Sequence, residues 1–199
     1  MGGITDILIL IPAAGSSSRM RGTDKLLEPV QGQPQLARVV QQALATGCRV
    51  VVTLPGVDGP RTAILAPHHR LRLMPVPDAA QGMSASLRAG VALVGDAPGL
   101  MVVPADMPDL ETEDFLRLAE AFLRDPDCPL RAASQQGLPG HPVILPRRLF
   151  AGIAELTGDQ GARSLLEGER VPLVALPGQR AITDLDTPED WAAWREAQR

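Results

Sequence analysis

The feature that most constrains the fold is Ile4–Ile11 (ITDILILI), an apolar segment rich in β-branched residues and without polar alternation after Asp6. Such a segment is typical of a strand buried on both faces, as in parallel sheets. A helix should follow, since apolar residues recur with helical spacing at Leu36, Val39, Val40, Ala43 and Leu44. Gly47 is placed to end that helix. A buried strand followed by an amphipathic helix favours an α/β domain.

The same alternation continues to about residue 125. We expect further strands at Arg49–Leu54, Arg72–Val76 and Gly99–Pro104, and helices at Met83–Val94 and around Phe115–Leu123. The prediction is therefore a three-layer α/β sandwich with a mostly parallel, Rossmann-like sheet.

The second part of the chain, about 126–199, is less regular. It predicts a strand at Pro142–Leu145, a helix from about Arg147, another at Ala162–Glu167, and short strands at Val171–Leu176 and Ala181–Asp184. One strand of this half is expected to run antiparallel. The last helix has the clearest start signal, with Thr187 at the N-cap and Pro188 at the first helical position.

Composition narrows the classes of protein. The 199 residues fit one domain, 1–199, and the net charge of −4 argues against nucleic acid as a partner. Cys48 and Cys128 lack metal-ligand spacing, and no apolar run approaches the ~20 residues of a membrane span. The first residues carry no Lys or Arg, so a signal peptide is not expected. These features predict a cytoplasmic protein that does not bind membranes.

Three unusual loops follow predicted strands, at the sheet edge where α/β proteins bind ligands. The first, 12–20, contains Ala13, Ala14, Gly15, Ser16 and Ser17, whose small side chains let a ligand approach the backbone. Arg19 and Lys25 would suit a triphosphate, although the loop has neither the Walker A nor the GxGxxG spacing. The alternative is an exposed turn with surface cations.

The second and third loops supply polar groups. In Asp78–Ser86, Ser84 and Ser86 could bind a base edge and Gly82 could admit the ring, or the serines could simply cap a helix. In the third, Asp106 emerges from a strand into a turn bounded by prolines, as a Mg²⁺ ligand or as a turn residue.

A fourth acidic group lies near the C-terminus. Asp184 and Asp186 are two residues apart, so on extended chain they can face the same side. We expect Asp184 to complete the metal site and Asp186 to organise the final helix, with turn and capping roles as the alternative for both.

Taken together, the loops resemble the molybdenum cofactor nucleotidyltransferases, which are MobA-like members of the nucleotide-diphospho-sugar transferase superfamily. The resemblance covers nearly the whole chain, in the family's order, through AAGSSSRMRGTDKLL (13–27), GQP (32–34), GMSASLRAG (82–90), PADMPDL (104–110), GLPGHPVIL (137–145), GDQGARSLL (158–166) and ITDLDTPEDW (182–191).

Within the family the chain is similar to the cytidylyl branch, which carries Ala-Ala-Gly after the first strand where guanylyl relatives carry Ala-Gly-Gly. It departs from the commoner pattern in three places. Gly22 comes one residue late after Arg19-Met20, and Met107 replaces the commoner Gln. Asp24 stands where Asn is commoner in the cytidylyl branch, although Asp is known there from the guanylyl branch. Because Lys25 and Asp106 are kept, these departures bear on base choice more than on chemistry.

The resemblance implies transfer of CMP from CTP to the phosphate of molybdopterin, with release of pyrophosphate and Mg²⁺ as cofactor. It implies catalytic roles for Lys25, Asp106 and Arg19, metal binding by Asp106 and Asp184, and nucleotide binding by about 1–125. The acceptor would lie on about 126–199, at Gly140, His141 and Arg163. His141 is expected to start a strand or contact substrate rather than act as a base, because the attacking phosphate is already ionised. Arg163 could instead be a surface helix residue.

Other functions remain open at this point. GTP could replace CTP, or the acceptor could be another small phosphate such as methylerythritol phosphate, although the Pro-Lys-Gln of that enzyme class is absent around Lys25. A different class would be a non-catalytic nucleotide-binding module that delivers cofactor to a molybdenum enzyme or acts with its chaperone.

Overall fold

The computed structural model describes residues 2–76, 82–158 and 161–198. Seven strands form one mixed sheet in the order β5-β4-β1-β6-β8-β7-β9. The strands are β1 (Leu8–Pro12), β4 (Arg49–Leu54), β5 (Leu71–Pro75), β6 (Gly99–Val102), β7 (Leu130–Ala133), β8 (Pro139–Pro146) and β9 (Leu173–Ala175). β8 runs antiparallel to both its neighbours, and the other pairings are parallel. The predicted α/β class, with an antiparallel strand in the C-terminal half, is confirmed.

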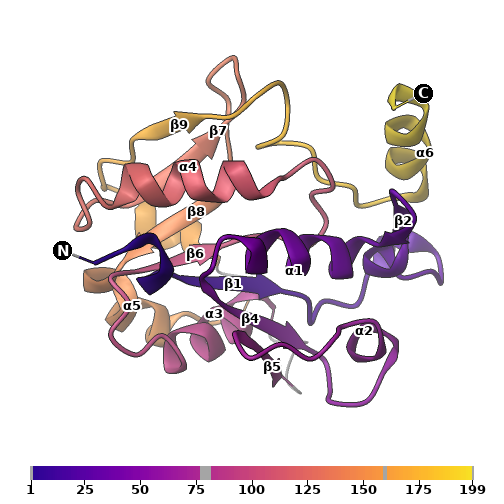
Figure 1. The fold of residues 1–199 in the computed structure, drawn as a ribbon, viewed down its shortest axis with the longest axis horizontal. Coiled ribbons are helices and arrows are strands. Elements are labelled where there is room, and N and C mark those ends of the chain that lie inside the picture. Colours follow the sequence, from indigo (N-terminus) through magenta and orange to yellow (C-terminus); the bar gives the residue numbers. More distant parts are fainter. Residues whose placement is uncertain (1, 77–81, 159–160, 199) are drawn as a thin grey trace.

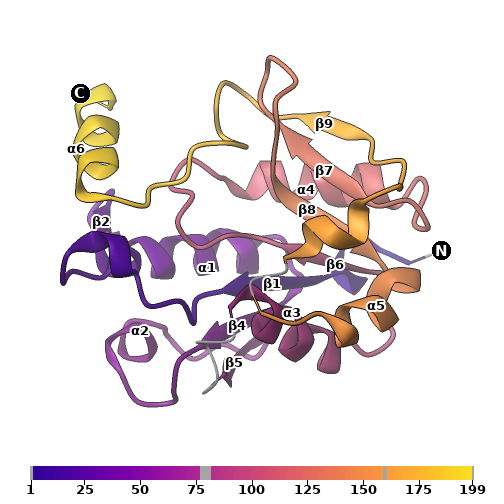
Figure 2. The same ribbon diagram turned by 180° about the vertical axis from the view of Figure 1, so that it is seen from behind.

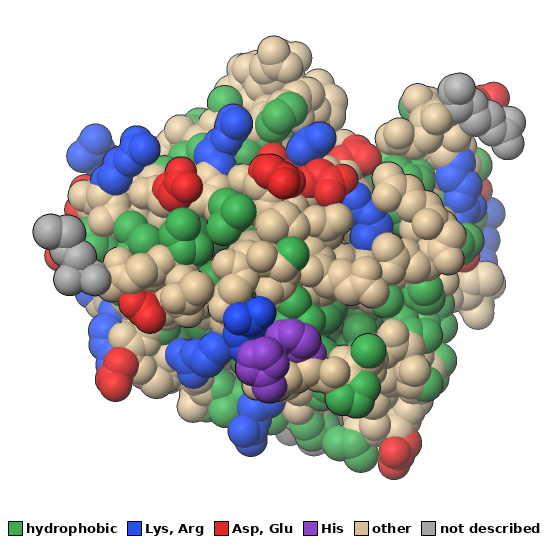
Figure 3. All heavy atoms as spheres, viewed as in Figure 1, with side chains coloured by type: hydrophobic (Ala, Val, Ile, Leu, Met, Phe, Trp, Pro, Cys, Tyr) green, Lys and Arg blue, Asp and Glu red, His purple; other side chains and the backbone are tan. Residues whose placement is uncertain are grey.

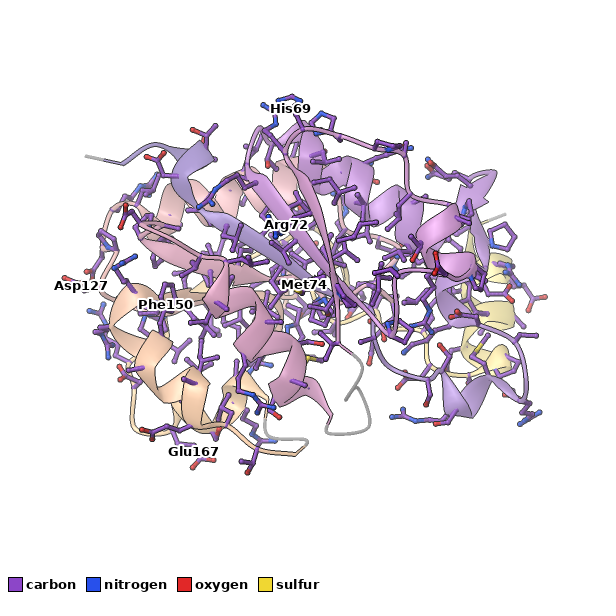
Figure 4. All side chains as sticks on the ribbon, turned by 90° about the horizontal axis from the view of Figure 1, so that it is seen from below. His69, Arg72, Met74, Asp127, Phe150 and Glu167 are labelled. Atoms are coloured by element: carbon purple, nitrogen blue, oxygen red, sulfur yellow. The ribbon has the colours of Figure 1, made fainter. Side chains whose placement is uncertain are left out.

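Helices cover both faces of the sheet. α1 (Gln35–Ala45) and α4 (Thr112–Phe122) lie on the face shown in Figure 1, while α3 (Met83–Ala92) and α5 (Phe150–Glu155) lie on the face shown in Figure 2. β1 contributes side chains to the core on both faces of the sheet. Ile9 and Ile11 belong to the core cluster that includes α1 and α4, and Leu8 and Leu10 belong to the cluster that includes α3 and α5. Figure 4 marks Phe150 on α5 and Met74 on β5, which contribute to that second cluster from distant parts of the sequence.

The sequence located most of these elements to within a few residues. The helical segment expected at Ala162–Glu167 is a 3₁₀ helix over Ala162–Leu166. The strand expected at Ala181–Asp184 is wrong. Residues 181–184 form a turn and extended chain held by backbone hydrogen bonds to Gln179. β7, the short hairpin β2 (Pro29–Val30) and β3 (Gln33–Pro34), and the one-turn helix α2 (Pro60–Ala63) were not expected.

The last helix, α6 (Pro188–Ala197), stands at one end of the sheet, away from the other helices (Figure 1). Its start is as predicted: Thr187 accepts a hydrogen bond from the backbone of Asp190, and Asp190 accepts one in return. Trp191 is buried against Met20, Val30 and Leu185. The final helix is therefore fastened to the loop that follows β1.

Two surface properties bear on partners. No helix in the described part of the chain has the length and apolarity to cross a bilayer. On the face that carries α1 and α4, basic and acidic side chains are interspersed (Figure 3). The rings of His68 and His69 stack on each other.

Candidate functional site

The candidate site lies where the strand order reverses. From β1 the chain continues to β4 and β5 on one side, and then crosses to β6 on the other side of β1. The carboxyl ends of β1 and β6 are held together as far as Val103, which donates a backbone hydrogen bond to Leu10 at 2.9 Å. Such a reversal opens a crevice between the two loops that follow these strands.

A cavity of about 580 Å³ occupies this crevice. Most of the nucleotide-site residues predicted from sequence line it, and so do several that were not named; the lining is Pro12, Ala13, Ala14, Gly15, Ser16, Ser17, Ser18, Arg19, Lys25, Leu26, Gly82, Met83, Ser86, Pro104, Ala105, Asp106 and Asp186. The structure therefore brings the first loop, the third loop and the C-terminal acidic segment into one cavity.

The first loop forms one wall of this cavity. Ala13 fixes its start by donating to the carbonyl of Thr53 at 2.9 Å. At Gly15 an added Cβ would meet no protein atom within 4 Å. The protein's own packing therefore leaves room at Gly15, and a larger side chain there would extend into space that a ligand can occupy.

Opposite charges meet at the floor of the cavity. The Nζ of Lys25 donates to Asp106 at 2.5 Å and to Asp186 at 2.6 Å, and Arg19 also pairs with Asp186. Burial lowers the pKa of Lys25, but the two carboxylates raise it more, so the pKa lies above its ordinary value and the ammonium stays charged. Asp106 and Asp186 thus already share one cation.

Asp186, rather than Asp184, reaches the cavity. From the sequence, Asp184 was expected to bind metal and Asp186 to organise the start of the last helix. In the structure the backbone N–H of Asp186 has the second role, because it donates to the Asp190 carboxylate at 3.2 Å, whereas the Asp186 side chain faces the cavity. Asp184 does not line the cavity. Burial, and then the nearby charge of Asp106, raise the pKa of its carboxyl group. In the described ranges, no group of three or more His, Cys, Asp or Glu side chains is arranged as a metal-binding cluster.

The second loop contributes only in part. Gly82 and Ser86 line the cavity, and Thr53 donates a hydrogen bond to the Ser86 hydroxyl at 2.9 Å. Ser84 is fully buried, accepts a hydrogen bond from Arg88 at 3.2 Å, and does not line the cavity. Residues 78–81 of this predicted loop lie outside the described part of the chain.

A second cavity of about 330 Å³ adjoins the first and shares Pro12, Met83 and Pro104 with it. Its remaining lining comes mainly from the predicted acceptor region: Leu87, Val102, Arg131, His141, Val143, Gly161, Ala162, Arg163 and Leu166. Arg131 was missed because it lies on β7, in the part of the sequence with the weakest periodicity. Burial, and then the positive charge of Arg163, lower the pKa of the Arg131 guanidinium.

Two predicted acceptor residues differ in their surroundings. Gly140 packs against the backbone, since an added Cβ would lie 1.8 Å from the carbonyl oxygen of Ala181, and it is not among the cavity-lining residues. His141 lines the second cavity, and its Nδ1 is buried without a hydrogen-bond partner among the described residues. Burial, followed by the charge of Arg131, lowers the pKa of His141 to about 4, so its ring is neutral at pH 7.

Comparison with known proteins places this arrangement in a family. Residues 9–174 match the MobA-like NTP transferase domain. The chain is 27% identical over 188 residues to the molybdenum cofactor cytidylyltransferase of Escherichia coli K12, covering 94% of each chain. It is 29% identical over 208 residues to a probable molybdenum cofactor guanylyltransferase of Natronomonas pharaonis, covering 98% of each.

Solved structures agree with this placement. Rv0371c of Mycobacterium tuberculosis H37Rv is 26% identical, with a TM-score of 0.80 over 98% of this chain and 100% of that one. A complex of Rv0371c with manganese is 25% identical, with a TM-score of 0.77 over 96% and 98% of the two chains. The chain therefore belongs to the MobA-like NTP transferase domain family and is a nucleotidyltransferase.

Proposed function

We propose that the protein transfers CMP from CTP to the phosphate of a molybdopterin-type acceptor and releases pyrophosphate. The observation that carries the proposal is the pair of adjoining cavities, which share Pro12, Met83 and Pro104. One cavity is built from a small-residue loop and a Lys–Asp cluster, and the other contains two arginines. The likeness to a molybdenum cofactor cytidylyltransferase supports the choice of substrates.

The first cavity supplies what a triphosphate requires. The acceptor phosphate attacks the α-phosphorus in line, its oxygen forms the new P–O bond, and the bond to the β-phosphate breaks as pyrophosphate leaves with its electron pair. Lys25 and Arg19 would neutralise charge on the phosphates, and the backbone of 13–17 would hold them in place. Positioning and electrostatic stabilisation suffice for this reaction, so no protein nucleophile is needed.

The acidic residues suit Mg²⁺. Asp106 and Asp186 both accept a hydrogen bond from the Lys25 ammonium, at 2.5 and 2.6 Å from Nζ, so the two carboxylates already share one cationic group. One or two carboxylates plus substrate phosphates form the usual Mg²⁺ site. When bound, the ion would neutralise phosphate charge and help orient the α-phosphate. Rv0371c has been solved with manganese, which supports a divalent site in this fold. Asp106 and Asp186 are our proposed ligands, with Asp184 as the competing candidate.

The second cavity suits an anionic acceptor with an apolar body. Arg131 and Arg163 lie close enough for the charge of Arg163 to lower the pKa of Arg131. The cavity therefore holds two positive charges, and a bound anion would reduce the repulsion between them. Met83, Leu87 and Val143 supply apolar surface beside them. The neutral His141 ring offers a hydrogen-bonding nitrogen rather than a charge.

The preference for cytosine rests on the first loop. Ala14 lines the nucleotide cavity and packs against Val76 and Ala85. Its methyl group takes up space that a glycine would leave free, which favours a pyrimidine over a purine.

The proposal is tested by measuring pyrophosphate release with CTP, GTP and ATP, each combined with molybdenum-loaded molybdopterin, methylerythritol phosphate and a hexose phosphate. We expect turnover with CTP and molybdopterin and little with the other pairs. Faster turnover with GTP would move the enzyme to the guanylyl branch, and turnover only with another phosphate would overturn the acceptor. Tight binding of Mg-CTP without pyrophosphate release from any acceptor would indicate the delivery module instead.

A further inference from the structure

Arg61, on the one-turn helix α2 between β4 and β5, lies directly behind the nucleotide-binding loop. It is 7% exposed and does not line the cavity. A guanidinium group carries five N–H donors. All five are used. Nε and Nη2 donate to the Asp24 carboxylate at 2.6 and 2.8 Å, and Nη2 also donates to Ser17 Oγ at 3.0 Å. Nη1 donates to the carbonyl oxygens of Ala13 and Gly15 at 2.6 and 2.7 Å.

These bonds set the direction of the loop's own donors. In a trans peptide the N–H of the next residue points opposite to the carbonyl. Because the carbonyls of Ala13 and Gly15 both point to Arg61, the N–H groups of Ala14 and Ser16 point away from it. Neither N–H donates to another group among the described residues, and both residues line the cavity. Two N–H groups of one turn that face the same cavity can bind an anion together, as in an anion-binding nest.

Asp24 links the same arginine to the catalytic lysine. Its Oδ1 accepts from the backbone N–H of Leu26 at 3.1 Å and so caps the 3₁₀ turn Lys25–Leu27. Burial would raise the pKa of Asp24, but the hydrogen bonds and charge of Arg61 lower it below its ordinary value. An asparagine in place of Asp24 would leave the buried Arg61 charge without this counter-ion.

We propose that Arg61 and Asp24 are a positioning pair that aims the N–H groups of the first loop, and Lys25, at the polyphosphate of the nucleotide. Arg61 acts through the loop and does not touch the substrate itself. This inference rests on the proposed function, because it takes the ligand of the first cavity to be a nucleoside triphosphate.

The test compares Arg61→Lys with a matched variant, Arg38→Lys. Arg38 is also buried, donates to the carbonyl of Leu110 and pairs with Glu111, but it lies outside the nucleotide cavity. Lysine keeps the charge and loses the planar five-donor fork. We expect Arg61→Lys to weaken binding of inorganic tripolyphosphate with Mg²⁺, followed by calorimetry, by about 10- to 100-fold, as for other residues that orient a site from behind. Arg38→Lys should bind it as the wild type does.

Kinetics separate positioning from general structural support. Arg61→Lys should raise the KM for CTP and leave the KM for the acceptor unchanged, whereas a smaller folded fraction would lower kcat alone. Asp24→Asn should shift tripolyphosphate binding in the same direction, and it carries the test if Arg61→Lys does not fold.

Unchanged tripolyphosphate affinity in Arg61→Lys, or an equal loss in Arg38→Lys, would overturn the assignment, as would a wild type that binds no tripolyphosphate. A wild type that releases no pyrophosphate from any nucleotide, but binds tripolyphosphate more tightly than Arg61→Lys, would refute the transferase proposal and leave Arg61 as assigned.

Discussion

The backbone N–H of Leu185 donates to the carbonyl oxygen of Asp106 at 3.1 Å, which joins the C-terminal segment to the loop after β6. Leu185 also packs with the buried Trp191 of α6. The position of Asp186 in the nucleotide cavity therefore depends on a helix that contributes no residue to that cavity.

Trp191→Ala should consequently destabilise the protein by about 3–5 kcal/mol, because a fully buried aromatic ring is lost and a cavity remains. Trp191→Phe should cost less, because the indole N–H has no hydrogen-bond partner among the described residues. Urea unfolding at pH 7 measures both changes. Trp194→Ala is the control, since this less buried ring should cost less than Trp191. Equal stability of Trp191→Ala and the wild type would show that α6 is not anchored there.

Lys25→Ala and Asp106→Ala should each lower turnover by about 10²–10³-fold, by analogy with the loss of one transition-state donor. Circular dichroism should show that the fold is retained. Arg21→Ala serves as the control, because Arg21 is exposed and its ion pair within the described ranges is with the exposed Glu189. Near-wild-type pyrophosphate release by both site variants would reject the catalytic assignments.

Asp186→Asn should weaken binding of Mn²⁺, measured by electron paramagnetic resonance, by at least about tenfold, the lower end of the cost of losing a metal-site partner. Asp184→Asn should have the smaller effect, because Asp184 does not line the cavity. The reverse order would restore the assignment made from sequence.

Arg163→Ala should raise the KM for the acceptor by about 10- to 100-fold, since a hydrogen bond to a charged group is worth about 1.5–3 kcal/mol. The KM for the nucleotide should not change, because Arg163 lines only the second cavity. Arg148→Ala is the matched control, as that arginine pairs with Glu169 away from both cavities. An unchanged acceptor KM would place the acceptor phosphate elsewhere.

His141 should make stability depend on pH. Its pKa is about 4 in the folded protein and 6.5 ordinarily, so between these values the unfolded chain binds more protons than the folded one. Stability should therefore fall as the pH falls through this window, by roughly 2 kcal/mol between pH 7 and pH 5 from this residue. Urea unfolding at the two pH values should show a loss in the wild type that is smaller in His141→Gln by that amount. Identical losses in the two proteins would contradict the lowered pKa.

Local patterns in the sequence were sufficient for most of the fold. β4 was located at its exact bounds, because a buried parallel strand has a recognisable composition, and α6 was located by its capping residues. Sheet order is non-local, but the loops after β1 and β6 were expected at one edge because parallel α/β sheets bind ligands there. The cavity that unites Gly15, Lys25 and Asp106 has that location.

The remaining features depend on contacts that sequence spacing does not encode. The choice between Asp184 and Asp186 required knowing that 181–184 is not a strand, since the direction of each side chain follows from the backbone conformation. No sequence signal marked Arg61, because a single arginine after Gly-Pro is common in loops. Its role depends on the contact with Asp24, which lies 37 positions earlier in the sequence. Arg131 lies in the less regular half of the sequence, where spacing does not distinguish a half-buried, cavity-lining arginine from a surface one.

Pro12, Met83 and Pro104 border both cavities, so these three residues form the wall that the two cavities share. Two of these residues are rigid rings, while Met83 is 39% exposed and unbranched, with several rotatable bonds. Met83 is therefore the most adjustable of the three residues that border both cavities. A change in the Met83 side chain would therefore alter the shape of both cavities at once.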